Sequence, residues 1–219
     1  RTFLIIFFIS GAASLLYQVT WSRLLTLHMG HTVAAIGTVL AAVMGGLALG
    51  AAFAGRYSRH CERRNALKIY AWLEIGIAVS ATLVPIVLML CQPLLSIAYD
   101  QGQNSSWFGL IRLSLSLALL IVPAAAMGAT LPIAVRWFVE NHGNAGAQTG
   151  QLYALNTLGA ASGAGISGFV LLPAIGLTST TYVGVILNLA AASGAFWLSK
   201  QESLVSVLHT EAEIERATG

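Results

Sequence analysis

The chain has 219 residues, of which 57% are hydrophobic and only 9% are charged. Soluble domains carry about 25% charged residues, so this composition excludes an ordinary soluble protein and indicates an integral membrane protein. The formal net charge is +3, but the basic residues lie beside the ends of apolar segments, where membrane topology accounts for them. We therefore expect a lipid bilayer around the chain and no nucleic-acid partner.

Long charge-free stretches predict six transmembrane helices, because a helix needs about 20 apolar residues to cross a bilayer. The expected spans are 2–22, 32–55, 66–91, 107–135, 148–172 and 178–199. The predicted fold class is all-α, a polytopic membrane protein whose six-helix domain occupies 1–200. The remaining segment, 201–219, sets apolar residues beside glutamates and is expected to be a cytoplasmic amphipathic tail on the membrane surface, or a linker.

Small residues recur at every fourth position in the second span and again in the fifth. The stripes consist of Ala42, Gly46, Gly50 and Ala54 in the second span, and Gly159 and Gly163 in the fifth. Positions four apart lie on one helix face, and small side chains let another backbone approach closely. We interpret both stripes as helix-packing surfaces; a ligand-facing groove is the alternative.

The distribution of basic residues predicts the side of the membrane that each loop faces. With the N-terminus inside, nine of the 11 Lys and Arg residues lie inside, and two, Arg23 and Arg112, lie outside. The largest inside cluster follows the second span and contains Arg56, Arg59, Arg63 and Arg64. Cytoplasmic loops are enriched in Lys and Arg, so both termini are expected in the cytoplasm.

Similarity between the two halves predicts an internal repeat. The segment GAASLLYQVTW at 11–21 resembles MGATLPIAVRW at 127–137, and the two glycine stripes resemble each other. Because the first and fourth spans cross in opposite directions, the similarity predicts a 3+3 inverted repeat, as in half of a major facilitator transporter. Chance similarity between membrane helices rich in Gly, Ala and Leu is the alternative.

Polar residues at membrane depth are the candidate substrate-binding residues, because burying them in a bilayer is costly. Glu74 and Asn156 each lie about 12 Å from the cytoplasmic side, so they could meet, with Tyr153 one turn nearer the cytoplasm. Gln18 and Arg112 form a second layer near the outer surface. One interpretation is a polar pocket between the repeats that attracts a cation. The other is hydrogen bonding between helices.

The two interpretations differ most in what they require of the Glu74 carboxylate. A carboxylate within a bilayer needs a partner, and Arg56 or Arg136 is the expected one. For Asn156, Gln18 and Asn188, which lies near the middle of the sixth span, we favour hydrogen bonding between helices.

The sequence gives no indication of a metal centre or a catalytic centre. All five histidines fall in predicted loops or in the tail, so no imidazole lies at membrane depth to ligate a haem. His28 and His31 alone make a poor metal site. The motifs GxSxG, HExxH and CxxC are missing from the sequence, so we expect no metal, no cofactor and no catalytic residue in these 219 residues.

Four segments resemble the membrane domain of the bacterial family of fused major-facilitator/spermidine-synthase proteins. They are FFISGAASLLYQVTWSRLL, VLAAVMGGLALGAAFAGR, MGATLPIAVRW and GQLYALNTLGAASGAGISGFVLLPAIGL, and the resemblance covers about 8–197. It implies the bacterial inner membrane and a cytoplasmic aminopropyltransferase-like domain with a Rossmann fold. The sequence departs from the family at Gln18, where a glutamate is common, and no glycine-rich nucleotide loop follows Lys200.

Three functions are compatible with these observations. We favour a non-catalytic membrane domain that anchors an enzyme-like domain or packs against other membrane protein subunits. The first alternative is half of a transporter for polyamines or other organic cations, acting as a homodimer or with a partner. The second alternative is the membrane part of an aminopropyltransferase whose catalytic domain lies outside these residues, so the enzyme question stays open at this point.

Overall fold

Every element in the described part of the chain is helical. The computed structural model describes residues 1–29, 33–91, 93, 106–139 and 142–218. Its elements are α1 (Thr2–Met29), α2 (Val33–Ser58), α3 (Arg63–Leu90), α5 (Ser106–Phe138), η1 (His142–Asn144), α6 (Ala145–Ile166), η2 (Ser167–Leu171) and α7 (Leu172–Thr218). The predicted all-α class is confirmed.

Five helical stretches among the described residues are long and apolar enough to cross a membrane. They are Thr2–Leu27, Ile36–Ser58, Arg63–Leu90, Leu117–Phe138 and Ala145–Ser203. These stretches support the prediction of a membrane protein. The last one has 59 residues and contains both the fifth and the sixth predicted spans.

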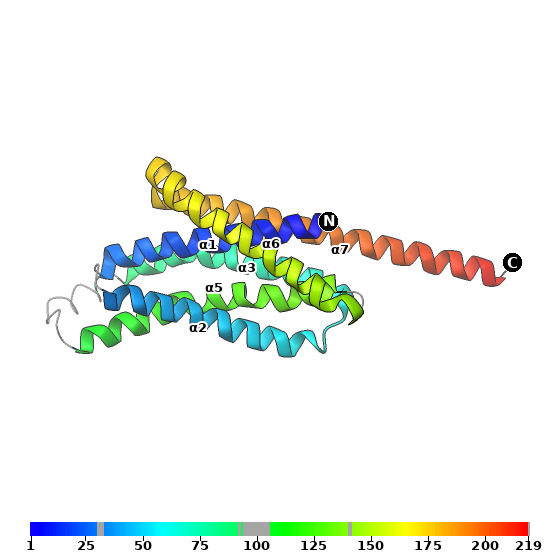
Figure 1. Cartoon of the computed structure of the whole chain (residues 1–219), viewed down its shortest axis with the longest axis horizontal. Coiled ribbons are helices and arrows are strands. Elements are labelled where there is room, and N and C mark those ends of the chain that lie inside the picture. Colours follow the sequence, from blue (N-terminus) through cyan, green and yellow to red (C-terminus); the bar gives the residue numbers. More distant parts are fainter. Residues whose placement is uncertain (30–32, 92, 94–105, 140–141, 219) are drawn as a thin grey trace.

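The chain changes direction within this last stretch. Gly176 has φ 76° and ψ −179°, a backbone conformation that is not helical and that residues other than glycine rarely adopt. The π-helical turn η2 precedes it, at Ser167–Leu171. Figure 1 shows the chain running toward this region along α6 and back again along α7. The turn needs a glycine because its backbone conformation would crowd a Cβ atom.

Helix α7 joins the predicted sixth span to the predicted tail. It continues to Thr218 with no break after Lys200, and its C-terminal end projects beyond the bundle (Figure 1). The segment expected to be a surface helix or a linker is thus a continuation of α7. Neither glycine nor proline occurs from Ala195 to Thr218, so the sequence contains no strong signal to end the helix.

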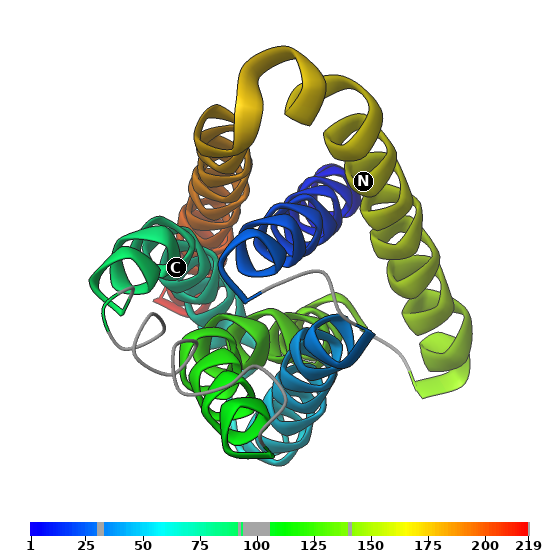
Figure 2. The same cartoon turned by 90° about the vertical axis from the view of Figure 1, so that its left-hand side faces the viewer.

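The helices pack in a pattern that separates α6 from α3. Helix α1 packs against α6 and α7, α5 packs against α2 and α3, and α3 packs against α7. Figure 2, which views the bundle from one end, shows α1 lying between α6 and α3. Buried side chains form one cluster that includes Tyr17 and Trp21 and another that includes Phe3, Phe7 and Tyr70.

The stripe on α2 lies against α5 of the same chain. A Cβ atom on Gly46 would lie 2.5 Å from the Cβ atom of Ala124, and one on Gly50 would overlap the backbone of Ala125. The two alanines of the stripe, Ala42 and Ala54, are also buried. Glycine is therefore required here for the close approach of two backbones.

The stripe on α6 makes the same kind of contact with α1. A Cβ atom on Gly159 would overlap the carbonyl group of Phe8, and one on Gly163 would overlap the carbonyl group of Ala12. Both stripes thus contact a neighbouring helix of the same chain, and neither is left open to a foreign subunit.

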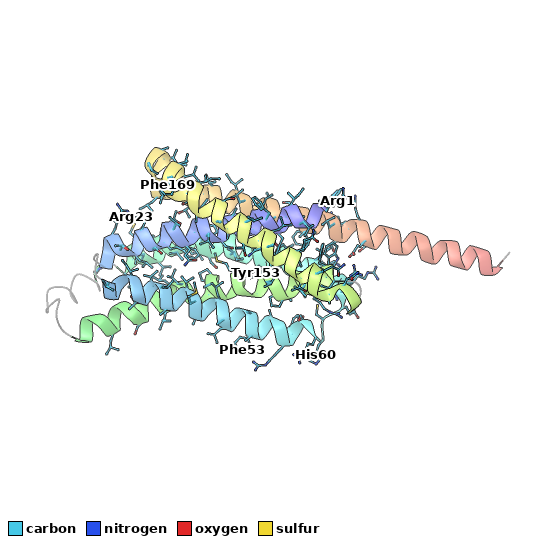
Figure 3. All side chains as sticks on the ribbon, in the orientation of Figure 1. Arg1, Arg23, Phe53, His60, Tyr153 and Phe169 are labelled. Carbon is cyan, nitrogen blue, oxygen red and sulfur yellow. The ribbon has the colours of Figure 1, made fainter. Side chains whose placement is uncertain are left out.

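The two ends of the bundle carry different labelled residues in Figure 3. Arg1 and His60 lie at one end, and Arg23 and Phe169 lie at the other. The N-terminus and the arginine-rich turn between α2 and α3 therefore share one end of the molecule, which we call the arginine end.

Candidate functional site

The Glu74 carboxylate connects three helices inside the bundle. Glu74 lies on α3 and is fully buried, with 0% of its surface exposed. Oε1 accepts a hydrogen bond from the Ser10 hydroxyl of α1 at 2.5 Å, and Oε2 accepts one from Nδ2 of Asn188 on α7. Each carboxylate oxygen is thus bound to a different helix, which makes Glu74 the polar link among α1, α3 and α7.

Two polar atoms near this link have no hydrogen bond of good geometry. They are the hydroxyl of Tyr70, one turn before Glu74 on α3, and Oδ1 of Asn188. Tyr70 also packs its ring against Phe3, with centroids 5.4 Å apart. The link is therefore a compact polar cluster within an aromatic core, with spare hydrogen-bonding capacity at Asn188.

Asn156 does not meet Glu74, which corrects the sequence-based expectation. Asn156 lies on α6, where its backbone carbonyl contacts Gly11 of α1, and α1 separates α6 from α3. Asn188 takes the expected place of Asn156 beside Glu74. Tyr153 lies on α6 with 61% of its surface exposed and forms no part of the buried cluster.

The predicted outer layer of polar residues is described only in part. Gln18 is half-buried on α1, next to Tyr17, whose ring stacks on Trp21 at 5.3 Å. The side chain of Arg112 lies outside the described residues. The pairing of Gln18 with Arg112 therefore stays a prediction.

Two arginines at the arginine end hold helix ends together. Nε of Arg136 donates a hydrogen bond to the carbonyl oxygen of Cys61 at 2.8 Å, and Nε of Arg63 donates one to the carbonyl oxygen of Trp137 at 2.9 Å. The hydrogen bonds link the start of α3 to the end of α5 in both directions. Arg136 is therefore engaged away from Glu74, contrary to the expected ion pair.

Trp137 extends this linkage to α7. Its indole Nε1 donates a hydrogen bond to Oε1 of Glu202 at 2.9 Å, and its ring lies 4.7 Å from that of Phe3. The hydrogen bond to Glu202 thus attaches the start of the α7 extension to the bundle at the arginine end.

The two cysteines are both free thiols. Cys61 lies in the turn between α2 and α3, with 6% of its surface exposed. Burial raises the pKa of the Cys61 thiol; Arg136 opposes this shift and Glu62 adds to it. Cys91 is half-buried after the other end of α3. Cys61 therefore has less thiolate at neutral pH than an exposed cysteine would have.

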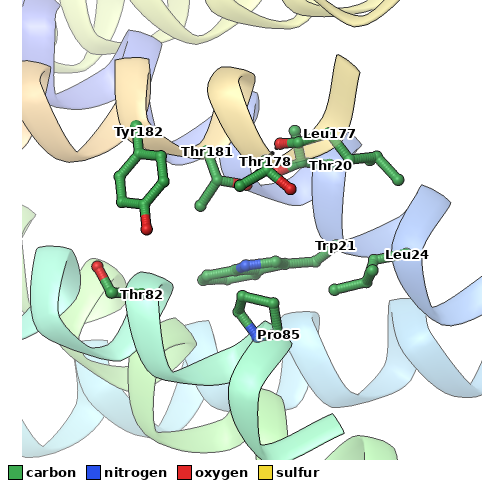
Figure 4. A pocket seen from close by; sticks show the side chains of 9 residues that line it. All are labelled: Thr20, Trp21, Leu24, Thr82, Pro85, Leu177, Thr178, Thr181 and Tyr182. Carbon is green, nitrogen blue, oxygen red and sulfur yellow. Dashed lines mark hydrogen bonds between the residues drawn. The ribbon is translucent and has the colours of Figure 1, made fainter. Parts of the chain in front are cut away.

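One pocket lies between α3 and α7 at the arginine end, and another lies among α1, α3 and α7 near the other end. Figure 4 shows the smaller pocket, of about 50 Å³, which Trp21, Thr82, Pro85 and Tyr182 help to line. The larger pocket, of about 440 Å³, is lined by Lys68, Phe196, Ser199, Lys200 and Ser203. The larger one carries two basic side chains, whereas the smaller one is lined by hydroxyl, aromatic and aliphatic groups.

Sequence reasoning missed Ser10 and the Lys68–Lys200 pair. Serine is common in membrane helices, so Ser10 gave no signal without knowledge of which helix faces α3.

Within the described residues no group of three or more His, Cys, Asp and Glu side chains is arranged to hold a metal ion. Comparisons with protein-family models, with curated proteins and with solved structures give no match to this chain.

Proposed function

We propose that this chain is a non-catalytic membrane domain with six crossings, which anchors a cytoplasmic domain or serves as a structural subunit in the bacterial inner membrane. The observation that carries the proposal is the link at Glu74. Both carboxylate oxygens are bound by neighbouring helices, so this acidic group joins helices of the bundle to one another. Substrate binding at Glu74 would require that link to break.

The sixth crossing is supported by the turn at Gly176. Helix α6 has 22 residues, and the part of α7 up to Lys200 is of similar length. At about 1.5 Å per residue, each is long enough to cross the hydrocarbon core. Since the chain reverses between them (Figure 1), the 59-residue stretch accommodates two crossings and returns α7 to the arginine end.

The proposed inverted repeat is supported by matching close contacts in the two halves. Gly50 of α2 faces the carbonyl of Ala125 in α5. Gly159 of α6 faces the carbonyl of Phe8 in α1. Gly159 follows Gly50 by 109 positions, and Ala125 follows Phe8 by 117 positions. The contact between α2 and α5 is thus repeated between α6 and α1.

The same two spacings relate a second pair of contacts. Gly128 of α5 faces the carbonyl of Leu47 in α2, and Gly11 of α1 faces the carbonyl of Asn156 in α6. Gly128 again follows Gly11 by 117 positions, and Asn156 follows Leu47 by 109. Two contacts that agree on both spacings favour an internal repeat over chance similarity between glycine-rich helices.

In the proposed repeat, α3 of the first half corresponds to α7 of the second half, with a spacing of 114 positions. Ala78 and Ala81 of α3 are buried, as are Ala192 and Ala195 of α7. Asn188 also follows Glu74 by 114 positions, so the two residues that join α3 to α7 are each other's counterparts. In the proposed repeat, the Glu74 link would therefore lie on the two-fold axis, which for an inverted repeat lies in the membrane plane.

The resemblance to the fused spermidine-synthase-like family extends this proposal to a partner domain. A domain of that kind would place its enzyme-like part after the cytoplasmic end of α7. The observed projection of α7 beyond the bundle is compatible with that arrangement, and aminopropyl transfer would then belong to the other domain.

Half of a transporter for polyamines or other organic cations is the second candidate. The inverted-repeat correspondence favours it, because transporters are often built from such repeats and place their substrate near the repeat interface. In this candidate, two copies or a copy and a partner would enclose the substrate.

One measurement tests the membrane placement that both candidates share, and a second distinguishes them. A soluble reporter fused after Gly219 should remain in the membrane pellet after an alkaline carbonate wash, as expected for an anchor. Proteoliposomes containing the chain should take up no more labelled spermidine than empty liposomes. Saturable uptake that Glu74→Gln abolishes would overturn the anchor proposal in favour of the transporter.

A further inference from the structure

We propose that the pocket bounded by Lys68 and Lys200 binds the phosphate of an anionic phospholipid. This pocket lies between α3 and α7 at the arginine end. The inference rests on the proposed membrane placement, but it does not depend on whether the chain anchors another domain or transports a substrate.

The two lysines approach the pocket from different helices. Lys68 lies on α3 and Lys200 on α7, both are exposed, and both line the same pocket of about 440 Å³. Among the described side chains, neither ammonium group forms an ion pair. A single phosphate between them would therefore meet two positive charges, and lysine binds phosphate through such point charges.

Aromatic side chains continue the pocket toward the apolar part of the bundle. Phe196 lines the pocket one turn before Lys200. Its ring meets the ring of Trp72 edge to face, with centroids 6.0 Å apart and planes at 89°. Trp72 lies one turn after Lys68 and is 65% exposed. Charged groups at one level and aromatic groups one turn deeper match a lipid headgroup and the start of its acyl chains.

The pocket at the other end of the same helix pair provides an internal comparison. At the 114 spacing, Tyr182 corresponds to Lys68, and Thr82 to Phe196; both Tyr182 and Thr82 line the smaller pocket (Figure 4). That pocket has about 50 Å³ and no charged residue in its lining. The repeat therefore supplies a recess at each end, and the lysines distinguish the recess at the arginine end.

The choice of an anionic lipid follows from charge. A zwitterionic lipid carries its own cation next to the phosphate, whereas an anionic lipid brings a net negative charge to the two lysines. Basic pockets between transmembrane helices bind anionic headgroups, and each lysine near a charged surface contributes about 1 kcal/mol. Removing both lysines should therefore weaken the preference for anionic over zwitterionic lipid roughly tenfold or more.

Native mass spectrometry of the detergent-solubilised full chain tests this site. Phosphatidylglycerol, phosphatidylcholine and inorganic phosphate would be titrated separately, and the bound lipid counted. The wild type should retain phosphatidylglycerol in preference to phosphatidylcholine, and Lys68→Gln with Lys200→Gln should reduce that retention roughly tenfold. Arg56→Gln with Arg59→Gln removes equal charge from the same end outside the pocket and should leave retention unchanged.

Three results would overturn the assignment. Equal retention by the wild type and the lysine variant would exclude the pocket, and equal losses in the two double variants would indicate a general charge effect. Displacement of the lipid by inorganic phosphate at similar concentration would show a site for free phosphate. Melting temperatures of all variants would identify loss of fold.

Discussion

The two ends of the bundle combine the same helix packing with different chemistry. Close contacts between α2 and α5 near Gly50 recur between α6 and α1 near Gly159. The guanidinium contacts of Arg63 and Arg136 belong to the arginine end, whereas the position that corresponds to Arg136 at the 117 spacing is Val19. Packing is therefore duplicated, whereas the guanidinium contacts of Arg63 and Arg136 are not, and the basic residues around them can set orientation and bind headgroups.

The largest expected effect comes from filling a close contact between backbones. Gly50→Val should abolish folded protein, because its Cβ would overlap the backbone oxygen of Ala125, and a backbone cannot move aside as a flexible side chain can. Gly163→Val should have the same effect in the other half. The measurement is the amount of monodisperse protein recovered in detergent.

Glycines with open surroundings provide the controls for this test. Gly45 and Gly165 have no atom within 4 Å of an added Cβ, so Gly45→Val and Gly165→Val should preserve the fold. Loss of fold in both the controls and the test variants would show that glycine content, not the repeated contact, is what matters.

A moderate effect is expected from the Glu74 link. Glu74→Ala should destabilise the protein by about 1–3 kcal/mol, because hydrogen bonds between membrane helices are each worth about 0.6 kcal/mol and the cavity adds to the loss. Glu74→Gln should cost much less. The Asn188 amide can turn so that Oδ1, which has no partner, accepts a hydrogen bond from the new amide.

Thermal unfolding of the purified variants measures this difference. Asn156→Ala is the control at the position that the sequence had placed beside Glu74, and it should shift the melting temperature less than Glu74→Ala. An equal loss for Glu74→Gln and Glu74→Ala would contradict the proposed hydrogen-bonding role.

A smaller effect is expected at the turn between α6 and α7. Gly176→Ala should destabilise the protein by about 1 kcal/mol, because the cost comes from backbone strain alone and an added Cβ meets no atom within 4 Å. Gly168→Ala, also in open surroundings but without positive φ, should be neutral or slightly stabilising. The melting temperatures of the Gly176→Ala and Gly168→Ala variants measure this difference. Equal melting temperatures would contradict the positive φ at Gly176.

The sequence was informative wherever a single helix carries the signal. The apolar stretches and the small-residue stripes depend on local composition and spacing, and they gave the helices and their packing faces. The similarity between segments 11–21 and 127–137 paired Gly11 with Met127. The contacts pair Gly11 with Gly128 instead, because only a contact with a second helix fixes the register of near-uniform apolar sequences.

The polar link could not be derived from depth alone. Glu74 and Asn156 were expected at the same depth, but α1 lies between their helices, and depth does not determine which helices are neighbours. Asn188 was recognisable as a polar residue within the bilayer, whereas its contact with Glu74 depends on the packing of α3 against α7. Arg136 was misassigned because its hydrogen bond goes to a backbone carbonyl, which no sequence pattern indicates.

The central claim is that the halves cross the membrane in opposite senses, so corresponding turns face opposite sides. The test labels single cysteines with an impermeant maleimide in sealed vesicles, using Arg59→Cys and Phe169→Cys. Both native cysteines are replaced so that only the introduced thiol can react. Burial raises the pKa of the Cys61 thiol, so a retained Cys61 would add labelling that increases as the pH rises. Arg59→Cys should react only from the cytoplasmic side, and Phe169→Cys only from the opposite side. Reaction of both from the same side would contradict the inverted repeat.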